Sequence, residues 1–218
     1  MKPSPARSLG LALILLALAG PLAFGAGTDG ASPAEGAPAG DLPEGTDFGS
    51  PNPFEKGTQT IGISAGLQAP LFTFGGDAST TDDKLKLGGL FAFQYQNFVA
   101  PGLALGGTIS GAFNGTIGGR SLFIAPLSFR TAYWWSLLPF ELCVGVEAGG
   151  YIMRLEGKGM LGPFAKAGGG AYWRSSPSWS LGLQTYYWLV PEIHTGDYAD
   201  LTRFGNFLEV GLSAVYHL

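Results

Sequence analysis

From residue 57 onward, the sequence alternates between apolar and small or polar residues with a period of two. In residues 61–69, every odd-numbered position is apolar and every even-numbered position is Gly, Ser or Gln. Side chains of a β-strand point alternately to opposite faces of a sheet, so this pattern predicts strands with one apolar face. The alternation recurs over eight segments: 61–69, 85–96, 103–113, 121–135, 140–153, 161–173, 179–189 and 206–218.

The links between these segments alternate in length. The longer, polar links are residues 70–84, 114–120, 154–160 and 190–205. The short, proline-containing links are residues 97–102, 136–139 and 174–178. Bacterial outer-membrane barrels have an even number of strands, short periplasmic turns and longer outer loops. We therefore predict an all-β fold over residues 57–218, an eight-stranded antiparallel up-and-down transmembrane β-barrel.

The N-terminal 25 residues have the pattern of a secretory signal peptide. Lys2 and Arg7 precede the apolar run 9–18, and small residues at Ala23 and Gly25 suit cleavage before Ala26. Residues 26–56 are rich in Gly, Pro and acidic residues, a composition that buries too little apolar surface to offset its ordering entropy. We predict a signal peptide over 1–25, a disordered linker over 26–56 (a peptidoglycan-side tether and a partially inserted plug are the alternatives), and export to the cell envelope.

The charge content limits the possible partners. Only 13% of the residues are charged, against about 25% in an ordinary soluble domain. Removal of the signal peptide would change the net charge from −4 to −6, which does not favour nucleic-acid binding. The single cysteine, Cys143, excludes an intrachain disulfide and is interpreted as a small buried residue.

Aromatic residues near the short links share the apolar face of the predicted strands. Rings with an apolar body and a polar edge favour the headgroup level of a membrane. The inner face is accordingly predicted to be small and polar, whereas a soluble barrel would point its large rings inward. The predicted membrane-interface aromatics are Tyr95, Tyr133, Trp135, Phe140, Trp173, Trp179 and Tyr216.

The opposite face carries three charges of each sign. Eight strands enclose an interior just wide enough for side chains to fill, and unpaired charges there would be costly. Arg130 lies on the segment next to that of Glu141 and Glu147, so pairing between them is geometrically plausible. We predict a compensated polar plug formed by Lys86, Arg130, Glu141, Glu147, Lys166 and Glu209.

Over residues 57–218 the chain resembles the small outer-membrane β-barrels, the group that includes the OmpA transmembrane domain, OmpX and OmpW. The resemblance rests on the architecture and on the segment 208–218, where apolar residues alternate and Tyr216 is third from the end. It implies outer-membrane lipids and the barrel-assembly machinery as partners, the latter through the C-terminal strand. That group usually ends in Phe or Trp, whereas this chain ends in Leu218.

No catalytic, metal or cofactor motif is predicted. Some barrels of this size are lipid-modifying enzymes that use a histidine and a serine at the outer rim. The candidate for a catalytic histidine here is His194, near Glu192, Thr195 and Asp197. That segment contains no serine nucleophile, so we interpret His194 as a solvated loop residue. The expected function is a non-enzymatic barrel with a structural or adhesive role, or a narrow conduit for small, hydrophobic molecules. A lipid-modifying enzyme and an exported lipocalin-like carrier are the alternatives, and the oligomeric state is open.

Overall fold

The computed structural model describes residues 53–75, 85–155 and 158–218. The predicted signal peptide, and the linker up to residue 52, lie outside these residues. The strands are β1 (Gln59–Phe74), β2 (Gly88–Ala100), β3 (Leu103–Gly115), β4 (Ser121–Leu137), β5 (Phe140–Leu155), β6 (Lys158–Ser176), β7 (Trp179–Glu192) and β8 (Arg203–His217), with a short 3-10 helix, η2 (Gly196–Leu201), before β8.

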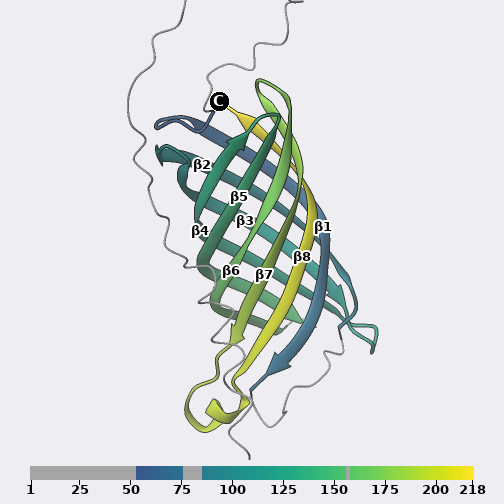
Figure 1. Cartoon of the computed structure of the whole chain (residues 1–218). Coiled ribbons are helices and arrows are strands. Elements are labelled where there is room, and N and C mark those ends of the chain that lie inside the picture. The colour runs from purple at the N-terminus through teal and green to yellow at the C-terminus, as the bar shows by residue number, and fades with distance from the viewer. Residues whose placement is uncertain (1–52, 76–84, 156–157) are drawn as a thin grey trace, which may run out of the picture. The chain divides into compact units, whose positions relative to one another are not determined.

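Every strand pairs antiparallel with its neighbours in the sequence, and β8 pairs with β1, so the sheet closes into a barrel in up-and-down order (Figure 1). This confirms the predicted fold class. Closure pairs the strand edges, which allows a sheet to lie in a solvent that offers no hydrogen bonds. Among the described residues, no helix is long and apolar enough to cross a membrane.

The two ends of the barrel differ. The turns β2–β3, β4–β5 and β6–β7 and the C-terminus lie at one end, here called the turn end, and η2 lies at the other, the loop end (Figure 1). The predicted outer link 154–160 is the exception. Its described residues pair across β5 and β6 up to Leu155 and Lys158, so they belong to strands rather than to a loop.

Large apolar side chains point away from the barrel axis. Leu127, Leu161 and Leu212 are 64%, 77% and 69% exposed. Other large apolar residues at alternate strand positions are exposed as well. A contiguous apolar surface of this kind is not stable in water, so it requires a lipid environment. The alternative of a soluble lipocalin-like carrier, which would gather these residues in a central core, is contradicted.

The expectation that the inner face is only small and polar is wrong. Buried aromatic and aliphatic side chains fill the lumen toward both ends of the barrel, where they form two clusters. The mouth cluster, toward the loop end, contains Leu90, Ala112, Leu122, Ile124, Tyr151, Phe164, Tyr186, Trp188, Val190 and Phe207. The turn-end cluster contains Phe54, Phe98, Ala104, Ala132, Trp134, Cys143, Tyr172 and Val215.

Glycines make room for these inward rings. Tyr151 lies opposite Gly162 on the neighbouring strand, and Tyr186 lies opposite Gly168. A Cβ atom on Gly162 would lie 2.5 Å from the Tyr151 hydroxyl oxygen, and one on Gly168 would lie 2.7 Å from a Tyr186 ring carbon. Each ring covers the glycine beside it, which explains how a narrow barrel holds large aromatic side chains and why glycine is frequent in its wall.

The last residues of the predicted linker are folded. Residues 53–58, here called the strap, cross the turn end, and Phe54 is 0% exposed within the turn-end cluster. The Gly102 amide donates to the Phe54 carbonyl (2.9 Å), and the Gly57 amide donates to the Phe98 carbonyl (2.7 Å). Composition averaged over residues 26–56 predicts disorder and is insensitive to one aromatic residue at the end of the segment. Residue 54 therefore belongs to the barrel, not to the linker.

Candidate functional site

Four charged side chains meet across the lumen: Arg130, Glu147, Lys166 and Glu209, here called the ionic belt. Arg130 Nη1 lies 2.7 Å from Glu147 Oε1, and Lys166 Nζ lies 3.4 Å from the same oxygen and 3.5 Å from Glu209 Oε2. All four side chains are buried. Two positive and two negative charges face one another, so no charge is left uncompensated in this low-dielectric interior.

Neutral side chains complete the coordination of the two belt carboxylates. Ser128 Oγ donates to Glu147 Oε2 at 2.7 Å. Gln184 Nε2 and Trp188 Nε1 donate to the two oxygens of Glu209 at 2.7 and 2.6 Å. Sequence reasoning missed Gln184 and Trp188 as belt partners, although both occupy even-numbered, inward positions on β7 and parity would have placed them in the lumen.

The belt separates the two apolar clusters. Arg130 Nη2 donates to the Tyr186 hydroxyl of the mouth cluster (2.6 Å) and lies 3.5 Å from Cys143 Sγ of the turn-end cluster. Lys166 Nζ lies 4.7 Å from the centre of the Tyr186 ring, a cation–π contact. Charges, amides and rings thus form a filled layer across the barrel.

Two of the six predicted lumen charges do not join this belt. Lys86 is exposed and precedes β2, which begins at Gly88 rather than at residue 85. Its placement in the lumen is therefore wrong, because parity holds only inside a strand. Glu141 is buried but pairs with Arg174 (2.9 Å) instead of Arg130. Arg174 was assigned to a turn, whereas β6 continues to Ser176 and directs it inward.

Ser180, His217 and Glu141 meet near the turn end. Ser180 Oγ is 2.8 Å from His217 Nε2, and the same nitrogen is 3.7 Å from Glu141 Oε2. A serine nucleophile needs the acid on the opposite ring nitrogen, where it orients the histidine. Here one nitrogen contacts both partners, and Ser180 is 0% exposed. The cluster is suited to holding strand ends together rather than to acyl transfer.

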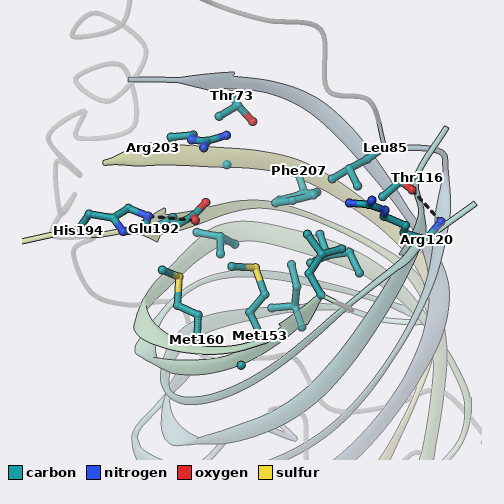
Figure 2. Close-up of a pocket in the computed structure, with 16 residues that line it drawn as sticks. Thr73, Leu85, Thr116, Arg120, Met153, Met160, Glu192, His194, Arg203 and Phe207 are labelled. Carbon is teal, nitrogen blue, oxygen red and sulfur yellow. Dashed lines mark hydrogen bonds and ion pairs between the residues drawn. The ribbon is translucent and has the colours of Figure 1, made fainter. Parts of the chain in front are cut away.

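A cavity of about 600 Å³, here called the mouth cavity, lies at the loop end (Figure 2). Its buried floor is part of the mouth cluster, namely Leu122, Ile124, Val190 and Phe207. Met153 and Met160, partners across β5 and β6, form one wall. The polar residues Thr73, Thr116, Arg120, Glu192, His194 and Arg203 also line it.

His194, the catalytic candidate considered from the sequence, lines this cavity. Its Nε2 lies 3.1 Å from Glu192 Oε1, and its backbone amide donates to Thr202 Oγ1. No serine is among the described residues that line the cavity. Within the described part of the chain, no group of three or more His, Cys, Asp or Glu residues is arranged to hold a metal ion.

The aromatic residues predicted for the membrane interface lie on the outer surface, close to the turn end. Six of the seven are exposed, and Tyr216 is half-buried against Trp179, with ring centres 5.0 Å apart. Tyr133 and Trp135 form a second outer pair at 4.8 Å. These positions fit rings that meet lipid headgroups, and that role stays a prediction.

A closed barrel with an apolar outer face and a charge-compensated, filled lumen defines the class of this protein: it is a small outer-membrane β-barrel, localised to the bacterial outer membrane. A family model matches residues 45–216, and an uncharacterized protein of Treponema pallidum (strain Nichols) is 31% identical over 181 residues, covering 76% of this chain and 79% of that protein. The chain belongs to the same family as this Treponema pallidum protein.

Two solved structures share the fold. The crystal structure of Neisserial surface protein A superposes with a TM-score of 0.53 at 9% identity, covering 74% of this chain and 97% of that one. The outer membrane protein OprG from Pseudomonas aeruginosa has a TM-score of 0.51 at 7% identity, covering 75% and 97%. At this level of identity, the similarity concerns the fold alone.

Proposed function

We propose that this barrel is a non-enzymatic receptor that captures small, largely apolar molecules in the mouth cavity, on the outer side of the membrane. The observation that carries the proposal is the cavity itself. Its volume of about 600 Å³ falls within the range of roughly 300–1,000 Å³ typical of small-molecule sites. Its floor is apolar, and the polar side chains that also line it can orient a bound molecule, as in such sites.

Orientation follows from the difference between the two ends. Single-chain outer-membrane barrels keep short turns and both termini on the periplasmic side, with the longer loops outside. The connections β2–β3, β4–β5 and β6–β7 are two residues each, at the end where the C-terminus lies. The mouth cavity, at the opposite end, therefore faces the exterior.

The walls suit a site that accepts apolar molecules of different shapes. The chain has three methionines, and two of them, Met153 and Met160, line the cavity. Methionine side chains are flexible and polarisable, so they adapt to ligands of different shape. Below the floor, the ionic belt and its aromatic neighbours occupy the lumen, which favours capture at the mouth over free passage through the barrel.

Quenching of Trp188 tests the proposal. Trp188 is buried in the mouth cluster that forms the cavity floor, so a bromine carried into the cavity should quench its fluorescence. A full-length variant with Trp134, Trp135, Trp173 and Trp179 changed to Phe is placed in nanodiscs and titrated with ω-bromododecanol. We expect saturable quenching.

The matched variants alter the cavity wall. Met153→Gln/Met160→Gln keeps the side-chain size but makes the wall polar, and should weaken binding by roughly tenfold or more, since each 1.4 kcal/mol of lost apolar contact is a factor of ten. Met153→Leu/Met160→Leu keeps the wall apolar and should bind normally. Equal, non-saturable quenching in all variants would show that the probe only partitions into the lipid, and would refute the proposal.

A further inference from the structure

Two methionines lie next to each other in one wall of the mouth cavity. Met153 on β5 and Met160 on β6 are direct partners across the two strands, and both side chains are half-buried. Figure 2 shows the two thioethers directed into the cavity from the same wall. Met153 packs against the mouth cluster, and Met160 Sδ lies 3.9 Å from the Tyr151 hydroxyl oxygen. Two sulfur atoms therefore border the cavity on the side formed by β5 and β6.

Phe207 faces these sulfur atoms from another strand. It lies on β8 in the mouth cluster and lines the cavity, and Figure 2 shows it across the cavity from Met153 and Met160. Gly205, two positions nearer the loop end, also lines the cavity. A Cβ atom on Gly205 would lie 3.1 Å from Phe207 Cε2 and 3.6 Å from Phe207 Cζ. A side chain at position 205 would thus cover this edge of the ring, and glycine leaves the edge uncovered on the loop-end side.

Thioether sulfur and an aromatic edge favour the same kind of ligand. A polarisable sulfur atom makes favourable contacts with aromatic rings. The edge of a phenyl ring is electropositive and its face is electronegative, so the edge of one ring packs well against the face of another. A saturated ring of the same size fills the same space and gains neither contact. The side chains of Met153, Met160 and Phe207 can therefore distinguish an aromatic ring from a saturated one.

We propose that the mouth cavity prefers apolar molecules that carry an aromatic ring, and that the ring lies between the thioethers of Met153 and Met160 and the uncovered edge of Phe207. This inference rests on the proposed function and adds the chemical class of the ligand. It assigns these three residues as the ones that determine specificity for the ring. The flexibility of the methionine side chains still admits rings with different substituents.

The experiment compares hexylbenzene with hexylcyclohexane, which differ only in the aromaticity of the ring. Each compound competes with ω-bromododecanol for the full-length variant that retains only Trp188, in nanodiscs, and displacement is read as recovery of Trp188 fluorescence. The concentration of each competitor in the lipid is measured, so that a difference in partitioning is not counted as binding. We expect hexylbenzene to displace the probe at a roughly fivefold or more lower lipid concentration, because the saturated ring lacks the sulfur and edge contacts.

Two variants remove the proposed contacts. Met153→Leu/Met160→Leu keeps the wall apolar but removes both sulfur atoms, and Phe207→Leu removes the ring edge. Each should abolish a large part of the preference for hexylbenzene while ω-bromododecanol still binds. Phe204→Leu is the matched control, because Phe204 lies on β8 at the same end, stacks on Phe74 with ring centres 4.9 Å apart, and is not among the described residues that line the cavity. The gel shift of the folded barrel verifies each variant, and the methionine variant decides the question if Phe207→Leu does not fold.

The outcomes separate this inference from the proposed function. Equal displacement by the two compounds, with saturable quenching by ω-bromododecanol, overturns the aromatic preference while the apolar receptor function stands. A preference that persists in full in the methionine variant and in Phe207→Leu also overturns the inference, because these side chains would not be its cause. If ω-bromododecanol gives no saturable quenching, both proposals fail.

Discussion

Lys166 connects the two carboxylates of the ionic belt, because its amine is within 3.5 Å of both Glu147 and Glu209. Arg130 contacts Glu147 more closely, at 2.7 Å. A buried charge that loses its partner retains its desolvation cost, so each of these residues depends on the others. Because they come from β4, β5, β6 and β8, the belt ties together strands on different sides of the barrel.

Glu147→Gln is predicted to lower the free energy of unfolding by about 3 kcal/mol or more, because it leaves two belt cations facing one carboxylate. The measurement is urea-induced unfolding in detergent, followed by the gel shift of the folded barrel. Arg130→Gln/Glu147→Gln restores charge balance and should recover part of the loss. Asp200→Asn, an exposed change in η2, serves as control. Unchanged stability of Glu147→Gln would show that the belt does not stabilise the fold.

At the scale of elements, the strap closes the turn end of the barrel. Its aromatic side chain, Phe54, stacks on Phe98 with ring centres 5.2 Å apart and lies 5.2 Å from Trp134. Cys143 belongs to the same cluster. The strand pairs that close the barrel do not include the strap, since β1 begins at Gln59, so loss of the strap contacts should leave the barrel closed.

Phe54→Ala is therefore expected to raise the rate at which a small thiol reagent labels Cys143, by roughly tenfold or more, since truncating a buried Phe typically costs 3–5 kcal/mol. Cys143 is the single cysteine, so the labelling reports one position. Phe54→Leu keeps the site apolar and should be labelled nearly as slowly as the natural protein. Equal labelling rates for Phe54→Ala and the natural protein, with the barrel still folded, would contradict a sealing role for the strap.

At the scale of the whole molecule, apolar side chains lie outside and charged side chains lie inside, the reverse of their placement in a soluble protein. Leucine, phenylalanine and valine side chains cover the outside. Among the residues that the structure describes, six charged ones are buried inside: Arg130, Glu141, Glu147, Lys166, Arg174 and Glu209. Lipid solvates the first group and mutual pairing stabilises the second. The closed backbone leaves the sheet without an edge, so the folded barrel should resist unfolding by detergent.

The protein expressed from its full sequence should remain with the outer-membrane fraction after carbonate washing. On a gel without boiling it should migrate at a different position from the boiled sample, because the closed barrel stays folded in detergent. Arg154→Gln should behave in the same way. Release into the carbonate supernatant, or identical migration of boiled and unboiled samples, would be incompatible with an integral barrel.

The sequence by itself determined the strands, their number and the outward face, because period-two alternation in the segments from Ile61 to Leu218 is a local property of β-structure. It also placed Arg130, Glu147, Lys166 and Glu209 on the inner face. The alternation between inward and outward positions holds only inside a strand, and the sequence does not define the strand ends closely. Lys86 was therefore predicted in the lumen although it precedes β2, and Arg174 was predicted in a turn although it lies on β6.

Only the tertiary structure decided which residues meet. Register and closure pair Glu141 with Arg174 and place Met153 and Phe207 in the lining of one cavity, and no spacing within one strand specifies either arrangement. The burial of Phe54 likewise depends on the turn-end cluster, which exists only once distant strands enclose it. Alternation is dictated by the geometry of one strand, whereas the cavity, the belt and the strap result from how eight strands wrap around a common axis.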